Sequence, residues 1–404
     1  MADDSAKLEA FRKEVRAWLR ANLPKGWGTP EYKMPEAMTP ERHQLGMWWT
    51  KKCYDMGYTG FGYPKEFGGI ERPLAERVII REEMARTGTP GGPYSLGLLL
   101  AAPTILRNGQ EWQKKRFISK ILSGEESWCE GFSEPNAGSD LANVQTTAAR
   151  DGDEWVVNGQ KVWSSNSRFA DFGVLLVKTD PAAPRHRNLS YFLFDAKAKG
   201  FDRRPLRQMT GEAEFGEMFF DNMRVPHVNL VGELGRGWYV AMTTLGAERG
   251  GGGGMAAAAA EGGRRVVGAM TLPMIELAKK TRRYGKTVWD DSYFRQRIIQ
   301  AAIDSEASRA FGMRNLARLR AKGEPPGNEV SMTKNFQAET RQRNSELSMD
   351  IIGAYSQMMR GSSLAVDDGD WVYAMLRAKG ATIEMGTSEV NRNIIAERIL
   401  GLPR

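Results

Sequence analysis

The spacing of hydrophobic positions changes twice along the chain. Up to about residue 125 apolar residues recur every three to four positions, as in segments 5–23, 73–87 and 111–124, which predicts helices with one buried face. From about 126 to 235 short β-rich runs alternate with tight turns, and after 236 the helical period returns. The pattern predicts an α+β multidomain protein. It has an N-terminal helical domain (1–125), a middle β domain (126–235) and a C-terminal helical domain (236–404).

Turn signals refine this prediction in the middle domain. Asp-Gly at 151–152 and Asn-Gly at 158–159 each predict a tight hairpin turn, and residues 181–188 predict an exposed loop. The order of helices, strands and helices argues against alternating βαβ units and therefore against a Rossmann fold. No predicted strand leads into the five glycines at 250–254, so they do not form a dinucleotide-binding loop.

Composition places the chain among globular proteins. It has 404 residues, of which 41% are hydrophobic and 26% are charged, and no apolar run reaches the length of a membrane span. The first residues form a charged amphipathic pattern, unlike a signal peptide. Cys53 and Cys129 are the only cysteines, too few for a disulfide framework. We therefore expect a cytoplasmic protein without a membrane span.

The charge and the titratable residues narrow the possible functions. The net charge is +8, but the basic residues are spread along helices and no nucleic-acid-binding motif accompanies them. An anionic coenzyme and an ordinary solvated surface both remain compatible with this charge. His43, His186 and His227 are scattered, and no CxxC, HExxH or GxSxG motif occurs. We expect neither a metal site nor a serine-hydrolase triad.

Three segments together carry a family resemblance. They are GFSEPNAGSDLANV at 131–144, KVWSSNSRFAD at 161–171 and GTSEVNR at 386–392. Taken singly, the first reads as an ordinary polar turn and the tryptophan of the second as a core residue. Taken in this order and within a helix–β–helix chain, the three segments resemble the acyl-CoA dehydrogenase flavoprotein family over essentially the whole length. The resemblance implies that the middle domain is a β-barrel or sandwich and that the C-terminal domain is a four-helix bundle.

The resemblance implies an FAD site. Phe132 and Ser133 match the positions that hold the flavin pyrimidine edge, and Trp163 matches the tryptophan that packs against the isoalloxazine. Ser165 matches the hydroxyl residue near flavin N5, and Thr387 a residue near the FAD diphosphate. The implied reaction is α,β-dehydrogenation of an acyl-CoA thioester, with an electron-transfer flavoprotein as acceptor.

The position of the catalytic base departs from the commonest family pattern. Most members have a carboxylate directly before GTS, where this chain has Met385, which cannot accept a proton. Glu384 lies one residue earlier, and we expect it to be structural. A minority branch places the base in an L-x-x-E-R sequence, which here is Leu-Gly-Ala-Glu-Arg at 245–249. The resemblance implies Glu248 as the base, and Arg249 and Ser139 as residues that contact the acyl-CoA.

The five glycines at 250–254 directly follow this sequence. A glycine inside a helix costs about 0.5–1 kcal/mol relative to alanine. Five consecutive glycines would therefore destabilise a helix and need a structural or functional explanation. One interpretation is a helix whose side chains are removed to widen an acyl pocket, for a bulky acyl group such as a steroid side chain. The other is a helix that unwinds into a mobile loop.

Two further departures concern the oligomer. Family homotetramers complete each FAD site with an arginine and a glutamine from a neighbouring subunit, where this chain has Thr281 and Asp350. This implies a hetero-oligomer with a second acyl-CoA dehydrogenase-like subunit, in which this chain bears the base. A homotetramer in which Arg282 or Arg283 replaces the missing arginine is the alternative. A non-catalytic scaffold subunit and a related flavin oxidase or monooxygenase also remain open.

Overall fold

The computed structural model describes residues 2–29, 31–32, 39–90, 96–249, 271–322 and 327–403. The chain divides into two compact units, Met1–Glu248 and Arg249–Arg404. Within the described ranges, no helix combines the length and apolar character needed to cross a membrane. The five glycines at 250–254, and with them both interpretations of that segment, lie outside the described residues.

The first unit contains a helical layer. Thr39 caps α2 by accepting a hydrogen bond from the Arg42 N–H, and Gly88 ends α3 in a left-handed conformation. Turns of π-helix at Gly97–Ala101 and Lys114–Ile118 connect the shorter helices. The helices are α1 (Ala2–Asn22), α2 (Pro40–Asp55), α3 (Leu74–Thr87), α4 (Ala102–Asn108), α5 (Glu111–Gln113), α6 (Ser119–Leu122) and α7 (Gly237–Arg249).

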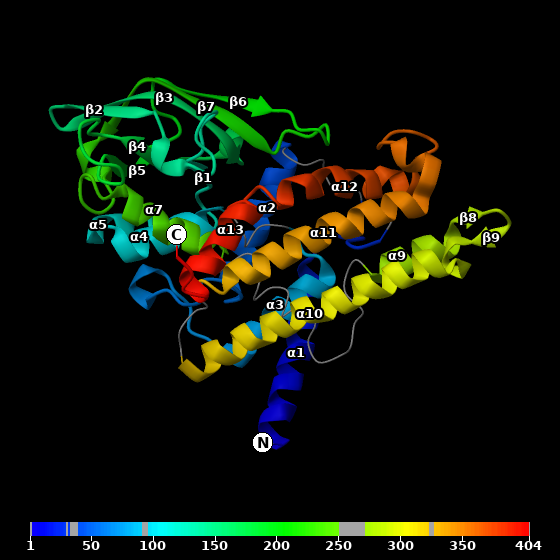
Figure 1. The fold of residues 1–404 in the computed structure, drawn as a ribbon. Coiled ribbons are helices and arrows are strands. Elements are labelled where there is room, and N and C mark those ends of the chain that lie inside the picture. The colour runs from blue at the N-terminus through cyan, green and yellow to red at the C-terminus, as the bar shows by residue number, and fades with distance from the viewer. Residues whose placement is uncertain are drawn as a thin grey trace. The chain divides into compact units, whose positions relative to one another are not determined.

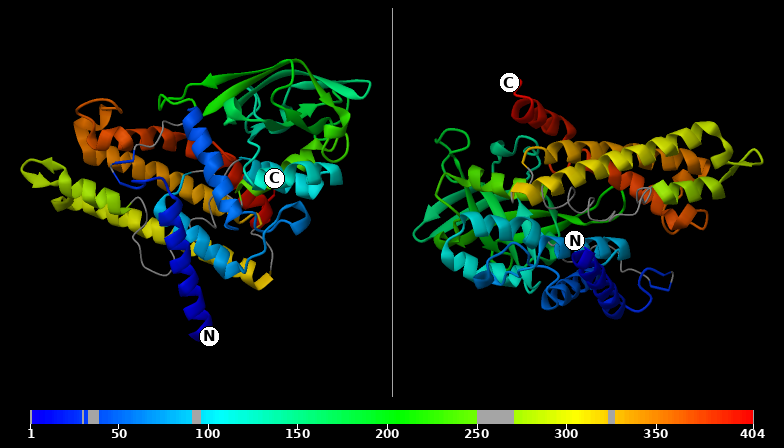
Figure 2. Two further views of the ribbon diagram at one scale, coloured as in Figure 1. Left: turned by 180° about the vertical axis from the view of Figure 1, so that it is seen from behind. Right: turned by 90° about the horizontal axis from the view of Figure 1, so that it is seen from below.

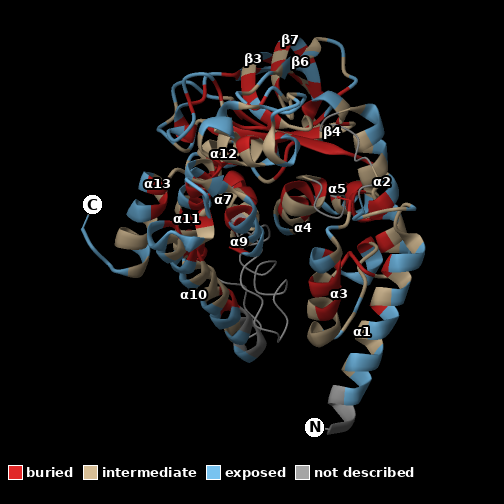
Figure 3. Ribbon diagram, turned by 90° about the vertical axis from the view of Figure 1, so that its right-hand side faces the viewer, coloured by how far each residue is buried: buried red, intermediate tan, exposed pale blue. Residues whose placement is uncertain are grey.

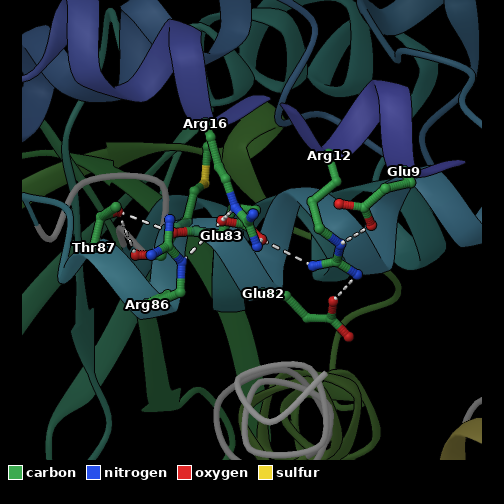
Figure 4. A network of polar contacts seen from close by, with 8 residues as sticks. Glu9, Arg12, Arg16, Glu82, Glu83, Arg86 and Thr87 are labelled. Atoms are coloured by element: carbon green, nitrogen blue, oxygen red, sulfur yellow. Dashed lines mark hydrogen bonds and ion pairs between the residues drawn. The ribbon is translucent and has the colours of Figure 1, made fainter. Parts of the chain in front are cut away.

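A buried glutamate joins two of these helices (Figure 4). Glu83 of α3 is 1% exposed and accepts hydrogen bonds from Arg12 and Arg16 of α1 and from Arg86 of its own helix. Arg12 also pairs with the neighbouring Glu82. The arginines therefore neutralise the buried carboxylate and fix α1 along α3, beside a core that α1, α2 and α3 share.

A curled seven-stranded sheet follows the first six helices (Figure 1). Its order is β1-β4-β2-β3-β7-β6, with β5 paired to β4. The five central positions of β4 are buried (Figure 3), so both of its faces are covered. The strands are β1 (Trp128–Gly131), β2 (Thr147–Asp151), β3 (Glu154–Ser165), β4 (Phe172–Lys178), β5 (Leu189–Asp195), β6 (Phe201–Leu206) and β7 (Phe215–Pro226).

Side-chain alternation on β1 separates two cores. Trp128 belongs to a core that the sheet shares with the helices, and that core includes Val240 of α7. Cys129, the next residue, belongs to the core enclosed by the strands. Successive strand residues point to opposite faces, so one strand contributes to both cores. This arrangement places the helical face of β1 and β5 against α7.

One of the two predicted hairpin turns is wrong. Asp151 and Gly152 do form the turn between β2 and β3, but Asn158 and Gly159 lie inside β3, at a bulge against β7. The Asn158 side chain donates to the Asn222 side chain of β7 and accepts from the Asn222 backbone N–H. A Cβ on Gly159 would lie 2.7 Å from the Thr146 Cα. The glycine therefore permits a close backbone approach within a continuous strand.

The second unit is helical. Its long helices run side by side (Figure 2) around a core that includes Met274, Phe294 and Ile351. Its elements are α9 (Thr271–Lys280), the two-residue strands β8 (Arg282–Arg283) and β9 (Lys286–Thr287), α10 (Ser292–Lys322), α11 (Val330–Ile352), α12 (Asp370–Ala381) and α13 (Ser388–Ile394). Helices, then a curled sheet, then helices again confirm the predicted fold class.

Candidate functional site

Two of the three motif segments lie side by side in the first unit. The Lys161 ammonium donates to the Phe132 carbonyl at 2.9 Å, and the Val162 N–H donates to the Ser133 carbonyl at 2.9 Å. The Ser164 hydroxyl donates to the Glu130 carbonyl at 2.6 Å. These bonds join the end of β1 to the end of β3. The sheet therefore brings the segment with Phe132 and Ser133 next to the segment with Trp163 and Ser165.

A buried ion pair supports this junction. Lys161 is 0% exposed, and its Nζ lies 2.8 Å from Glu134 Oε1. Burial lowers the pKa of Lys161 to about 8, against the opposing effect of Glu134. Burial also disfavours the Glu134 carboxylate, but Lys161 and the Thr146 and Gln145 N–H donors outweigh it and hold the pKa of Glu134 below its usual value. Both groups are therefore charged at neutral pH.

Trp163 has an unusual conformation and is open to solvent. A register shift between β3 and β7 covers Lys161 to Ser164, and inside it Trp163 has φ 61°. Its side chain is 56% exposed, and its ring meets Phe215 edge to face at 5.7 Å. Left-handed backbone costs a non-glycine residue about 1–2 kcal/mol, and such strain clusters at functional sites. The bulge thus turns a large flat ring outward.

The three serines named from the sequence differ in exposure. Ser133 and Ser165 are half-buried, and Ser165 is the last residue of β3, opposite Phe215. Ser139 is exposed in the loop after β1, next to Asp140, which pairs with Arg185. Ser133 and Ser165 therefore belong to the junction that also presents Trp163, whereas Ser139 lies on a surface loop.

Glu248 lies in the last turn of α7 and is half-buried. One turn earlier, Thr244 is 0% exposed and its hydroxyl shares hydrogen bonds with Tyr191 of β5 at 3.0 Å and Thr104 of α4 at 2.9 Å. Residues four apart lie on the same helix face, so Glu248 follows Thr244 on the side that faces the sheet. The Arg249 side chain lies outside the described residues.

The third motif segment begins a helix in the second unit. Thr387 caps α13 by accepting a hydrogen bond from the Val390 N–H at 3.2 Å. Met385 has φ 55°, and the Gly386 carbonyl accepts from Lys334 at 2.6 Å. Glu384 pairs with Arg377 at 3.0 Å, a contact that gives it a structural role.

The positions expected to face a neighbouring subunit have partners within the second unit. The Arg283 guanidinium donates to the backbone carbonyls of Asp350 and Ile351, and the Asp350 carboxylate pairs with Arg297 at 2.9 Å. Arg282 is exposed, and its side chain makes a long contact of 3.4 Å with the Gly285 carbonyl. Arg282 is therefore less constrained than Arg283.

Sequence reasoning missed several polar residues of the first unit. Glu134 and Lys161 form a buried ion pair, and Tyr191 is buried against Thr244, but no motif marks these positions as buried. For Lys161, the two irregularities of β3 break the two-residue alternation that would have shown an inward position. Among the described residues, no group of three or more histidine, cysteine, aspartate or glutamate side chains could hold a metal ion.

Comparison with protein families gives three matches along the chain. Residues 5–125 match the acyl-CoA dehydrogenase N-terminal domain, residues 129–223 the middle domain and residues 235–400 the C-terminal domain. Together these matches span nearly all of the sequence.

Individual relatives agree with these matches. The chain is 37% identical over 404 residues to the acyl-CoA dehydrogenase IpdE1 of Mycobacterium tuberculosis, covering 98% of each protein. Its fold is similar to that of the ChsE4-ChsE5 complex of Mycobacterium tuberculosis, with a TM-score of 0.77, 30% identity and 98% coverage of both chains. It is also similar to the Tcur3481-Tcur3483 steroid ACAD, with a TM-score of 0.78, 29% identity and coverage of 99% and 98%.

Proposed function

Because this chain belongs to the acyl-CoA dehydrogenase family and is thus an oxidoreductase, we propose that it is the base-bearing, FAD-binding subunit of a heteromeric dehydrogenase. Its reaction introduces a Cα–Cβ double bond into a bulky acyl-CoA thioester. The observation that carries the proposal is the hydrogen-bonded junction of β1 and β3, which presents Trp163 and Ser165 beside Phe132 and Ser133.

The residues of this junction fit a flavin. A half-exposed indole held in a strained conformation offers a flat apolar surface for an aromatic ring system. The half-buried hydroxyls of Ser133 and Ser165 offer hydrogen bonds at its edge. Thr387 of the second unit is included for its match to the family position near the diphosphate; its hydroxyl caps α13 and its carbonyl accepts from Asn391. FAD, when bound, supplies the acceptor for the hydride that leaves the β-carbon.

Glu248 is the residue we assign to remove the α-proton. The α-proton of a thioester is weakly acidic, so its base must be positioned at hydrogen-bonding distance and away from bulk water. Glu248 is half-buried, and the Thr244–Tyr191–Thr104 hydrogen bonds anchor its helix one turn earlier. Met385 offers no proton acceptor, and Glu384 is occupied by Arg377. Glu248 takes the α-proton while the electron pair of the C–H bond forms the double bond.

The substrate class follows from relatives and from sequence. One similar structure is named a steroid ACAD, and a run of five glycines follows Glu248. We assign a polycyclic or steroid side-chain acyl-CoA as substrate, with Ser139 and Arg249 contacting it and an electron-transfer flavoprotein reoxidising the enzyme.

Replacement of Glu248 tests the assignment of the base. We expect Glu248→Gln, assembled with the partner subunit and reconstituted with FAD, to lose flavin bleaching by a steroid side-chain acyl-CoA under anaerobic conditions. The expected loss in rate is about 10²–10⁴-fold or more, as for removal of a general base. Glu384→Gln is the matched control and should bleach at nearly the wild-type rate. Unchanged bleaching in Glu248→Gln would overturn the assignment.

A further inference from the structure

The turn that opens the third motif segment holds two left-handed residues in a row. Met385 has φ 55° and Gly386 has φ 85°. Glycine adopts this conformation readily, but in a methionine it brings the Cβ close to the following carbonyl oxygen. A strained residue of this kind persists only where the surrounding structure fixes it. The turn leads directly into Thr387, whose hydroxyl caps α13.

Two buried side chains hold the carbonyl group of this turn. The Lys334 ammonium of α11 donates to the Gly386 carbonyl at 2.6 Å, and the Asn391 side-chain amide of α13 donates to the same oxygen at 2.8 Å. Asn391 also donates to the Thr387 carbonyl at 3.0 Å. Lys334 is 7% exposed and Asn391 is 0% exposed. The turn is therefore fixed from a neighbouring helix as well as from its own.

The polar groups around the turn are not all paired. Among the described residues, Ser388 Oγ and Asn391 Oδ1 are covered and have no hydrogen-bond partner. Hydrogen bonds from its own N–H and from Thr387 lower the pKa of Glu389, and the Lys334 charge acts in the same direction, so the field of the buried ammonium reaches the first turn of α13. Strain, a buried charge and unpaired polar atoms each lower stability, so their presence together indicates a functional task beyond helix capping.

We propose that Lys334 is a positioning residue for flavin binding: by holding the Gly386 carbonyl, it fixes the backbone at Thr387 for contact with the FAD diphosphate. This inference rests on the proposed function, which assigns that contact to Thr387. Without the ammonium group, the Gly386 carbonyl keeps Asn391 as its donor, and Met385 is free to relax toward the right-handed conformations that it prefers. The ammonium also adds a positive charge at this turn, which favours an anionic diphosphate.

The conformation of the turn can be measured without flavin. Hydrogen exchange at the Ser388 and Asn391 N–H groups, which donate to the Thr382 and Thr387 carbonyls, reports on it in the assembled protein. We expect both groups to exchange about tenfold faster in Lys334→Met, because a hydrogen bond from a charged donor is lost beside them. Unchanged exchange in a folded Lys334→Met protein would overturn the inference.

FAD affinity tests the action on the cofactor. Titration of FAD into the flavin-free assembly, followed by flavin fluorescence, should give a Kd about tenfold higher for Lys334→Met than for wild type. Lys334→Arg keeps a cationic donor, so its Kd should stay within about threefold of wild type. Arg392→Met is the matched control, because Arg392 also joins α13 to α11, through Glu339 at 2.6 Å, but at an exposed position. Its Kd should stay within about twofold.

The outcomes separate the inference from the proposed function. Equal FAD affinity in wild type and Lys334→Met would overturn the inference, as would an Arg392→Met or Lys334→Arg protein that binds FAD as weakly as Lys334→Met. A wild-type assembly that binds no FAD would instead overturn the proposed function, while hydrogen exchange would still judge whether Lys334 fixes the turn.

Discussion

At the scale of single residues, the site depends on one buried cation. Lys161 bonds to the Phe132 carbonyl and to Glu134, and so ties the two motif segments that carry the proposed flavin-contact positions. Glu134 in turn accepts the backbone N–H groups of Gln145 and Thr146. An ion pair of this kind is a modest source of net stability, because desolvation offsets the attraction, but removal of one partner leaves an uncompensated charge.

We therefore expect Lys161→Met to destabilise the first unit by about 3–5 kcal/mol, since Glu134 would stay buried without its cation. Denaturant unfolding followed by tryptophan fluorescence measures this change. The double variant Lys161→Met/Glu134→Gln should recover most of the loss, because it removes both charges. Lys197→Met is the control: Lys197 is 75% exposed and 3.5 Å from Asp171, a surface pair worth less than about 1 kcal/mol. A single variant as stable as the control would contradict the expectation.

Motif matching identified some residues of this site from the sequence and missed others. Phe132, Ser133, Trp163 and Ser165 were found from sequence, and the structure brings their segments together. The roles assigned to these residues stay predictions. Lys161 could not be found that way, because the burial of a charged residue depends on which strands and helices pack around it. The two-residue alternation along a single strand does not show which other strands and helices will pack against it.

At the scale of elements, the helical periodicity of segments 5–23 and 73–87 predicted α1 and α3. The predicted turn at Asn158–Gly159 was wrong because the same dipeptide suits a bulge, and the close approach comes from Thr146, the residue before β2. Likewise, nothing in the sequence of α1 predicts which acidic residue its arginines meet.

The Glu83 network gives a pH dependence at this scale. Burial opposes its ionisation, but hydrogen bonds from Arg16, Arg12 and Arg86 prevail and hold the pKa of Glu83 below its ordinary value of 4.5. The carboxylate therefore binds protons less readily in the folded state than in the unfolded one. Its stabilising contribution is present above that ordinary value and is lost as the pH falls through the lower folded-state value.

We accordingly expect the backbone amides of α1 to lose protection from hydrogen exchange as the pH falls below 4.5, once intrinsic exchange rates are corrected for. At neutral pH, Glu83→Gln should lower the free energy needed to open α1 by about 2–4 kcal/mol, because three arginines lose their shared anion. Glu82→Gln, which removes a contact to Arg12 alone, should have a smaller effect. Equal protection in wild type and Glu83→Gln would show that α1 docks through its apolar face instead.

At the scale of the whole molecule, the positions expected to serve a neighbouring subunit are those that depart from the family. The Thr281 hydroxyl donates to the Leu277 carbonyl at the end of α9, and Asp350 pairs with Arg297. An aspartate near a diphosphate would be repulsive, so we propose that a second, different subunit supplies the missing contacts. The ChsE4-ChsE5 complex, a structure similar to this chain, contains two different named components.

The flavin content of the purified protein tests the proposal of a second, different subunit. We expect the chain produced alone to bind FAD in low occupancy, and the chain produced with an acyl-CoA dehydrogenase-like partner to form a heteromer with one FAD per pair of unlike subunits. The visible spectrum and the mass of the assembly measure both quantities. Full occupancy in a homotetramer would favour Arg282 as the replacement contact, and Arg282→Ala should then release the flavin.

The sequence by itself determined the order of helical, β and helical regions, the family and the positions that match its motifs, because periodicity and motif spacing are local along the chain. Only the tertiary structure decided which of those positions meet. It turned Trp163 outward at a bulge and buried Lys161 against Glu134. These outcomes depend on packing between strands and helices far apart in sequence. The cost of a buried charge is set by that packing rather than by the residue itself.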